Sequence, residues 1–409
     1  MDLFDLSSHV QSMGAPNAVM IAAAVLLVGA LAGEAIARTT RLPRIIGYTL
    51  AGWIAVAAGQ GLTMPLQGTA RLVLDLALAL LLFEIGCRVR LRWLLRNPYL
   101  LATSLLESLL AAVAVYVAMT ALGLAPLAAA ACAVLAMPAS AAVAGRVALE
   151  LGADGQVTQR MTVLTALNTV WAVIAMIVLK AVAMASAADD SATPIAALAV
   201  AAGESVALAA VLAVGVRVVT RRMDLRSEST VLPILGMILL AVGTARWLGA
   251  SSLLVPLLAG SLLRNGSQRA MVWPRHFGTA GGVLVLMLFV IVGASWSPEV
   301  LAAGGLAGLV LLAVRGLTKG AVVLALSRPS DLGLRQGAAL AVTLTPLSAT
   351  ALVMLSDLQA GLPDLGLVVA PIILTAVAVL EFLGPIAVQM ALRHAGELPA
   401  GPINSKEPR

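Results

Sequence analysis

Long apolar segments with almost no internal charge constrain the fold of this chain more than any other feature. Of its 409 residues, 61% are hydrophobic and only 11% are charged. A soluble domain carries about a quarter charged residues, because water must solvate its surface. A chain with so little charge cannot cover itself for water, so the sequence predicts an all-α polytopic membrane protein.

The apolar segments follow one another along the whole chain. A helix that crosses a bilayer needs about 20 mainly apolar residues. Runs bounded by charge, Pro or Gly predict about 13 transmembrane helices, at residues 17–37, 43–60, 69–87, 98–122, 125–149, 157–184, 194–219, 229–247, 250–264, 272–295, 299–326, 335–357 and 363–391. The expected parts are an extracytoplasmic N-terminus (1–16), a transmembrane domain (17–391) and a short cytoplasmic tail (392–409).

The basic residues indicate an orientation. Cytoplasmic loops of membrane proteins retain Lys and Arg, and with the N-terminus outside, the cytoplasmic gaps hold 21 of the 26 basic residues. The outside gaps hold only Arg71 and Arg246. The net charge of +6 therefore reflects topology rather than nucleic-acid binding. We expect the N-terminus outside and the C-terminus in the cytoplasm, and the Ala-rich composition fits a bacterial inner membrane.

Three short landmarks recur at a nearly constant spacing. They are Gly52 and Gly260, 208 positions apart; Leu82–Ile85 and Leu288–Ile291, 206 apart; and Pro138 and Pro346, 208 apart. This offset corresponds to seven helices, and an odd number places the second copy upside down in the membrane. The sequence therefore predicts inverted repeats, with halves at about 43–184 and 250–391.

Pro138 and Pro346 lie in the middle of apolar segments. A proline there removes a backbone hydrogen bond, and a bilayer tolerates this only where protein or a water-lined cavity satisfies the backbone. Paired broken helices bring their positive and negative ends to one place, which suits ion binding. We therefore expect two crossed, broken helices around an ion site.

Motifs along the chain carry a family resemblance. They are Arg41–Gly52, Leu80–Gly86 with the basic stretch after it, Pro138–Glu150, Arg315 with Lys319 and Gly320, and Leu344–Pro346. In these motifs the chain resembles the sodium/proton exchanger transmembrane family, in particular the monovalent cation:proton antiporter-2 branch that contains potassium-efflux systems. The resemblance covers residues 17–391. It implies a secondary active antiporter that exchanges Na⁺ or K⁺ for protons, as a homodimer in the lipid bilayer.

The resemblance breaks at the sixth segment. The family pattern there is an Asp-Asp or Asn-Asp pair whose second acid binds the cation or the proton. This sequence reads Asn168-Thr169 instead, with no Asp or Glu from Gln156 to Ala188. An Asn amide and a Thr hydroxyl offer neutral oxygens to a cation, but neither exchanges a proton near neutral pH. A displaced carboxylate would have to carry the proton.

The residues expected to bind or move the ion lie on both repeats. The oxygen ligands are Asn168, Thr169, Ser140, Thr345 and Ser348, and the charged residues are Lys319, Arg315 and Glu107. The 208-residue offset relates Glu107 to Arg315, so the fourth and eleventh segments can present opposite charges. In the family pattern a basic residue at Lys319 neutralises the acid of the sixth helix. Without that acid, Lys319 can exchange protons itself or attract an anion.

Glu84 and Glu381 are two further acids within apolar segments. Burying an ionisable residue at the bilayer centre costs at least about 2.5–3.5 kcal/mol. Both acids lie nearer the ends expected to be cytoplasmic, where a carboxylate can reach the interface. We expect each to be a structural or vestibule charge.

Two other functions fit the same scaffold: an anion or organic-acid carrier built around Lys319, and a non-transporting sensor paralogue. An enzyme is not expected, because the sequence has no nucleophile–base pair or phosphate loop. Cys87 and Cys132 form no CxxC or Cys/His cluster, so we expect no metal and no cofactor.

Overall fold

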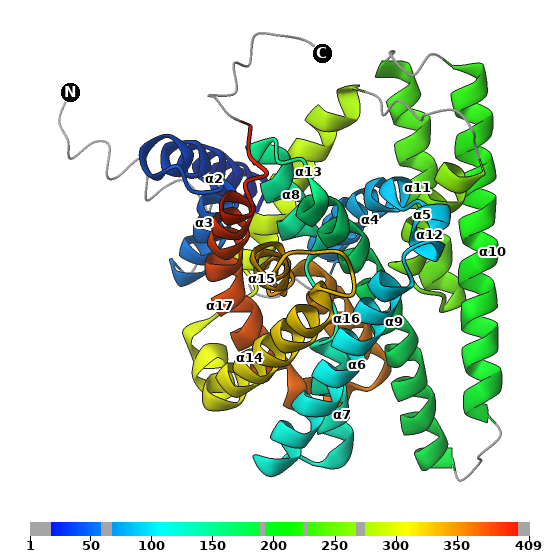
Figure 1. The fold of residues 1–409 in the computed structure, drawn as a ribbon, viewed down its shortest axis with the longest axis vertical. Helices are drawn as coiled ribbons and strands as arrows, with labels where there is room; N and C mark the ends of the chain where they lie inside the picture. Colours follow the sequence, from blue (N-terminus) through cyan, green and yellow to red (C-terminus); the bar gives the residue numbers. More distant parts are fainter. Residues whose placement is uncertain (1–17, 59–67, 189–192, 224–227, 267–274, 400–409) are drawn as a thin grey trace, which may run out of the picture.

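The computed structural model describes residues 18–58, 68–188, 193–223, 228–266 and 275–399 (Figure 1). Within these ranges all the regular structure is helical. The helices are α2 (Ala18–Thr40), α3 (Ile45–Ala57), α4 (Gly68–Arg88), α5 (Leu91–Leu95), α6 (Pro98–Ala121), α7 (Pro126–Leu135), α8 (Ala141–Leu151), α9 (Gln156–Ala188), α10 (Thr193–Arg222), α11 (Glu228–Leu248), α12 (Leu254–Asn265), α13 (Arg275–Gly293), α14 (Pro298–Ser327), α15 (Leu334–Thr343), α16 (Ala349–Gly361) and α17 (Pro363–Ala395). The expected N-terminal part (1–16) and the end of the tail lie outside the described residues.

Each expected segment coincides with one helix or with a pair of helices that share an interruption. The fifth segment is the pair α7 and α8, and the twelfth is the pair α15 and α16. The short helix α5 was not predicted. Among the described residues, seven helices are long and apolar enough to cross a membrane by length and composition. Helices such as α3 and α12 are too short to meet that criterion, so it does not reach the expected 13.

Local sequence explains where the interrupted helices begin and end. α7 starts at Pro126, whose missing N–H costs nothing in the first turn. It ends just before Met137 and Pro138. Ser140 then caps α8, its hydroxyl oxygen accepting a hydrogen bond from the Val143 amide at 3.2 Å. Gly152 ends α8 in the left-handed conformation, with φ of 61°.

Four glycines allow close packing between helices of the two expected halves, 43–184 and 250–391. An added Cβ would strike the carbonyl oxygen of Val290 at Gly52 and that of Phe83 at Gly260. It would strike Leu257 at Gly86 and Thr49 at Gly293. The contact of α3 with α13 is thus repeated by the contact of α12 with α4. Glycine allows the backbones to approach this closely, as is common between membrane helices.

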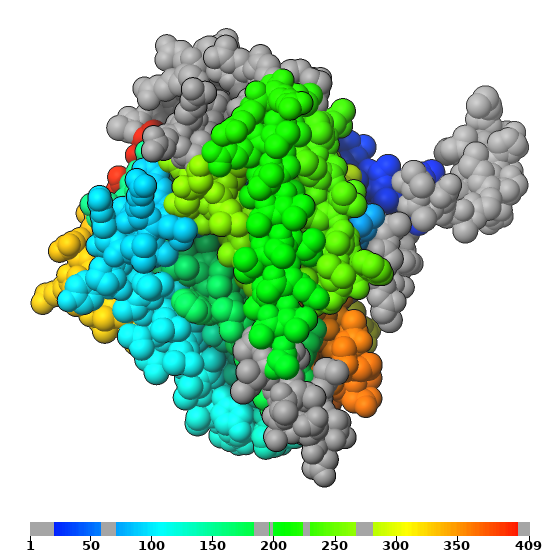
Figure 2. All heavy atoms as spheres, turned by 90° about the vertical axis from the view of Figure 1, so that its right-hand side faces the viewer, coloured from blue at the N-terminus to red at the C-terminus, as the bar shows by residue number. Residues whose placement is uncertain are grey.

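Helices α10 and α11 form one edge of the molecule, on the right of Figure 1. Figure 2 shows α10 running along this side, facing the viewer. Its outward side chains include Val206, Val211 and Val214, and α11 adds Leu232 and Leu240, all exposed. An apolar face of this length suits contact with lipid rather than water.

Candidate functional site

The two interruptions meet at one point, called the crossing below: residues 136–140 between α7 and α8, and residues 344–348 between α15 and α16. The Ser140 amide donates a hydrogen bond of 2.8 Å to the Pro346 carbonyl, across 206 residues of chain. Ser140 begins α8 and Ser348 begins α16, so both half-helix N-termini start here. Four helix ends with opposite partial charges therefore surround the crossing.

Arg315 on α14 satisfies the carbonyl ends of the half-helices. Its side chain is buried, and the guanidinium donates to the carbonyls of Ala136 and Pro138 at 2.7 Å each. It also donates to the Thr345 carbonyl. These carbonyls lack intrahelical partners because they follow the last turns of α7 and α15. The planar fork of an Arg suits several acceptors at once, so Arg315 balances both negative helix ends.

Lys319 lies one turn after Arg315 on the same face of α14. Its Nζ donates to Glu107 Oε2 on α6 at 2.6 Å, and both side chains are 0% exposed. Glu107, which the repeat relates to Arg315, is thus paired with Lys319 instead. A buried ion pair is stable only while each charge keeps its partner. The Lys319–Glu107 pair therefore connects α6 to α14.

Asn168 on α9 is also tied to α6. Its Oδ1 accepts hydrogen bonds from Ser104 at 3.2 Å and Ser108 at 3.1 Å. Ser104 in turn accepts a hydrogen bond from the Trp171 indole at 3.0 Å. Asn168 is buried, and its Nδ2 has no partner among the described residues. α6 therefore carries both the Asn168 cluster and the partner of Lys319.

Four threonines spaced by four, three and four residues line one face of α9. Thr162, Thr165 and Thr169 each donate the hydroxyl hydrogen to a carbonyl one turn earlier, at 2.9–3.0 Å. Thr158, the first, donates to Glu397. With the hydrogens used, the hydroxyls present lone pairs, which suit a cation better than an anion.

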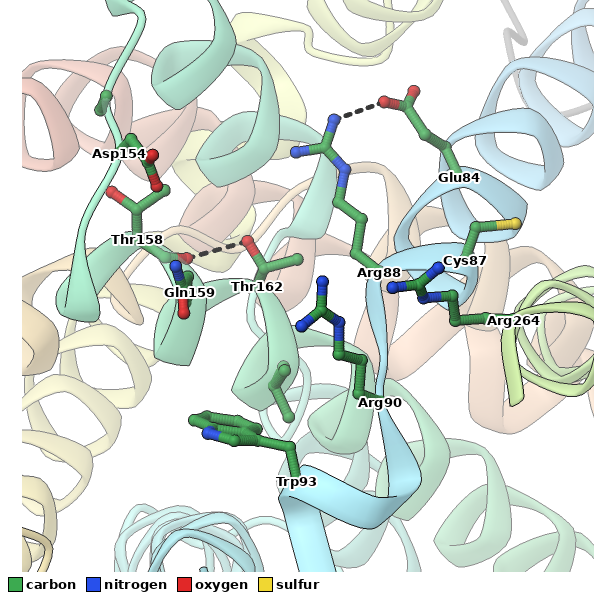
Figure 3. Close-up of a pocket in the computed structure, with 12 residues that line it drawn as sticks. Glu84, Cys87, Arg88, Arg90, Trp93, Asp154, Thr158, Gln159, Thr162 and Arg264 are labelled. Carbon is green, nitrogen blue, oxygen red and sulfur yellow. Dashed lines mark hydrogen bonds and ion pairs between the residues drawn. The ribbon is translucent and has the colours of Figure 1, made fainter. Parts of the chain in front are cut away.

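A pocket of about 660 Å³ opens at the start of this threonine face (Figure 3). Thr158, Gln159 and Thr162 form one wall, and the end of α4, the α4–α5 connection and α12 form the other. Arg88, Arg90 and Arg264 extend toward the space between these walls. Glu84 also lines the pocket and pairs with Arg88 at 2.6 Å. The pocket is therefore basic, although the threonine face next to it offers hydroxyl oxygens.

Comparisons with known proteins identify the family. The sequence matches the profile described as sodium/hydrogen exchanger, transmembrane, over residues 22–394. The chain belongs to the sodium/hydrogen exchanger family. It is accordingly a multi-pass membrane protein of a transporter family. A comparison with curated protein sequences finds no significant match.

Two solved structures resemble this chain in fold. One is the sodium proton antiporter MjNhaP1 from Methanocaldococcus jannaschii at pH 8, with a TM-score of 0.63, 15% identity and coverage of 91% of this chain and 94% of that chain. The other is a structure of MjNhaP1 from an electron-microscopy map, with a TM-score of 0.70, 14% identity and coverage of 98% and 100%. At this identity the likeness concerns the fold alone.

The structure brings some of the expected site residues together and leaves others apart. Ser140, Thr345, Ser348 and Arg315 all lie at the crossing. Thr345 is half-buried, and its hydroxyl donates to the Val342 carbonyl at 2.8 Å. Within the described part of the chain, no hydrogen bond joins Asn168 or Thr169 to the crossing. Their helix, α9, nevertheless packs directly against α7, α8, α15 and α16, the helices on either side of the two interruptions.

An ion network that the sequence did not predict lies at the opposite end of α4 from the pocket. Arg71 pairs with Asp75 at 2.9 Å and with Asp357 on α16 at 2.7 Å, and Arg246 on α11 also pairs with Asp75. Arg71 and Arg246 lie in the first turn of α4 and the last turn of α11, at the ends that we expect to face the outside. Burial of Arg71 and Asp75 is possible because each keeps an opposite charge.

Glu381 departs from the expectation of a carboxylate that reaches the interface. It lies on α17 and is 0% exposed. The position of Glu381 near a segment end suggested that it reaches the interface. Distance from a helix end, however, does not show which helices cover a side chain. α17 packs against α14, α15 and α16, among others, which enclose Glu381. It is the one buried carboxyl among the described residues that has no ion pair.

Proposed function

We propose that this protein exchanges a monovalent cation, Na⁺ or K⁺, for protons across a bacterial inner membrane. The observation that carries the proposal is the crossing of two interrupted helices, joined by the bond from Ser140 to Pro346. Such paired half-helices bring opposite dipole ends and free carbonyls to one place, which is how secondary transporters bind ions. Membership of the sodium/hydrogen exchanger family supports the same conclusion.

The difference between the two ends of the molecule supports an alternating-access mechanism, because a pocket of about 660 Å³ lies at one end and a smaller one of about 190 Å³ at the other. The pocket beside Arg90 opens at one end of α4 and α9. At the other end, Arg71 and Asp357 join α4 to α16. The ion would enter the pocket, pass along the hydroxyls of α9 and reach the crossing. Release on the far side would require the Arg71 network to open.

We infer that 13 segments cross the bilayer, with the pair α7 and α8 and the pair α15 and α16 each counting as one segment. The N-terminus then lies outside, and the pocket faces the cytoplasm with most of the basic residues. The transmembrane domain extends over 17–391, with halves at about 43–184 and 250–391, and works as a homodimer in the lipid bilayer.

Reconstitution into liposomes that contain a pH-sensitive dye tests the exchange. After a pH gradient is imposed, Na⁺, K⁺ or Li⁺ should collapse it, whereas choline should not. Thr169→Val removes one oxygen ligand with little change in volume and should slow the collapse at least about tenfold, the equivalent of 1.4 kcal/mol. Thr103→Val is the matched control, because its buried hydroxyl likewise donates one turn back, to Tyr99. A wild type that is silent with every cation would refute cation exchange.

The basic pocket favours a second candidate, an anion or organic-acid carrier. Arg88, Arg90 and Arg264 outnumber Glu84 and Asp154 among its lining residues. In the same liposomes, such a carrier would move succinate or inorganic phosphate with no need for Na⁺ or K⁺. Arg90→Gln would then reduce anion uptake. If cation exchange is correct, Arg90→Gln should leave the selectivity among cations unchanged.

A further inference from the structure

Glu381 is a buried acid at the crossing. Gly384 lies one turn further along α17 and packs against Pro346, where an added Cβ would come within 3.1 Å of the Pro346 side chain. Residues three apart share a helix face, so Glu381 points to the same side. The Ser348 hydroxyl lies near enough to the Glu381 carboxyl to act on it. The carboxyl therefore lies at the start of α16.

Glu381 differs from the other buried acids of the described residues. Asp75 is paired with Arg71, and Glu107 is paired with Lys319. Neither oxygen of Glu381 has a hydrogen bond or an ion pair within the described part of the chain. An ionised carboxylate without a partner is costly to bury, by far more than a neutral acid. The Glu381 carboxyl can therefore be neutralised by a proton or by a bound cation.

The charged side chains on the helices around α17 interact with groups other than Glu381. Arg315 is bound to carbonyls, Lys319 to Glu107, Arg44 to Glu34 and Glu150, Arg335 to the His394 carbonyl and Asp357 to Arg71. Arg146, Arg160 and Lys180 act at longer range on Glu150, Asp331 and Asp357, respectively. Among the described residues, no charged side chain acts on the Glu381 carboxyl. Its state of protonation can therefore follow the ion that enters the crossing.

Two neutral hydroxyl oxygens belong to the first turn of α16. The hydroxyls of Ser348 and Thr350 are buried, and neither has a hydrogen-bond partner in the described residues. α16 begins here, and the positive end of a 13-residue helix stabilises a carboxylate next to it. Unpaired hydroxyls and a carboxylate are ligands that a small monovalent cation can use. One buried carboxyl cannot hold a proton and balance a cation at the same time.

We propose that Glu381 is the carboxyl group that alternates between a proton and the transported monovalent cation, with Ser348 and Thr350 as neutral oxygen ligands. This inference rests on the proposed antiport and names its proton carrier. When Na⁺ or K⁺ binds, the proton leaves Glu381 for water, and the carboxylate balances the cation. When the cation leaves, a proton returns. One positive charge is thus exchanged for another.

Proton release on cation binding tests this directly. The purified full-length protein is placed in detergent with weak buffer and a pH dye, and Na⁺ or K⁺ is added, with choline as a control. The wild type should release about one proton per chain. Glu381→Gln should release none, Glu381→Asp should still release protons, and Glu204→Gln, a half-buried acid on α10, should behave as the wild type. Release from Glu381→Gln equal to that of the wild type would overturn the inference.

Transport measurements separate this inference from the proposed function. If the wild type exchanges cations for protons in liposomes and Glu381→Gln does so equally well, antiport stands and the role of Glu381 is refuted. If the wild type exchanges no cation, the antiport proposal itself fails, and the inference fails with it. Should Glu381→Gln not fold, Glu381→Asp decides: the pH at half-maximal exchange should move, and an unchanged pH profile would refute the assignment.

Discussion

At Lys319 an ammonium group is enclosed by protein and has the Glu107 carboxylate at 2.6 Å. Two charges removed from water repay their desolvation only through each other. Either charge alone would therefore destabilise the folded protein, whereas the two together do not. This makes the pair a structural connection between α6 and α14, and it leaves Lys319 less available for an anion than an unpaired lysine would be.

Loss of one member of this pair should cost more than loss of both. Lys319→Met alone leaves Glu107 buried and uncompensated, which should destabilise the protein by about 3–5 kcal/mol. Lys319→Met combined with Glu107→Leu should recover most of this loss. Thermal unfolding of the purified variants in detergent measures the difference. Equal melting temperatures for the single and the double variant would show that an unpaired Glu107 does not destabilise the protein.

The sequence identified the unusual residues but not their partners. Spacing placed Arg315 and Lys319 on one helix face, and the repeat related Glu107 to Arg315. The partner of Glu107 is Lys319, one turn further along α14. The sequence does not show how α6 and α14 are aligned along their axes, and this alignment decides which of the two basic side chains contacts Glu107. Asp75 was missed altogether. A single acid near a segment end carries no sign of the two arginines that neutralise it.

Among the elements, α9 depends on a residue far away in the chain for its first turn. Glu397, just after α17, accepts from the amides of Val157 at 2.6 Å and Thr158 at 2.8 Å. It also accepts from the Thr158 hydroxyl at 2.7 Å. A carboxylate at a helix start satisfies free N–H groups and suits the positive helix end. The helix that carries Asn168 is thus fixed by the end of the last helix.

Removal of this cap should loosen the start of α9. Glu397→Ala should cost about 1–2 kcal/mol of local stability, and the amides of residues 156–160 should exchange hydrogen faster. Glu397→Gln keeps an acceptor oxygen and should lose less. Hydrogen exchange followed by mass spectrometry resolves this segment. Unchanged protection in Glu397→Ala would show that other contacts hold the turn.

The interrupted elements were the most predictable part of the fold. Pro138 and Pro346 indicated both breaks, since a proline removes the bond that would continue the helix. Apolar length then gave the other segments to within a few residues. The helix α5 was not predicted because five residues within a basic stretch have no apolar period. The sequence predicts the crossing itself. It does not predict that Arg315 donates hydrogen bonds to the carbonyl groups there.

For the whole molecule, reciprocal glycine packing supports the proposed inverted repeat. Gly52 and Gly260, equivalent in the two halves, each approach a carbonyl of the other half. Equivalent positions should therefore respond alike. Gly52→Ala and Gly260→Ala should each destabilise the protein by about 1–3 kcal/mol through overpacking.

Gly243→Ala on α11 is the control, because nothing lies within 4 Å of an added Cβ there. It should be neutral or should stabilise the helix by up to about 1 kcal/mol. Thermal unfolding of the three variants in detergent compares them. A large cost at only one of the two equivalent glycines would show that the packing is not symmetric in energy.

The Arg71 network should set which end of the molecule is open. Asp357→Asn removes one partner of Arg71 and should favour opening at this end. The test uses Ser251→Cys, which lines a pocket of about 190 Å³ beside Asp357, in a background with Cys87 and Cys132 replaced by Ala. A membrane-impermeant thiol reagent should label it several-fold faster with Asp357→Asn. Equal labelling rates would mean that the network does not hold this end closed.

The reciprocal glycine packing has a consequence for how the protein is made. α3 and α4 leave the ribosome about 200 residues before the helices that cover their glycine faces. At 5–20 residues per second, this gap lasts roughly 10–40 s. During that time the first half is inserted in the membrane with its flat faces uncovered. A gene split between α10 and α11 should therefore yield a stable protein only when both fragments are synthesised in the same cell.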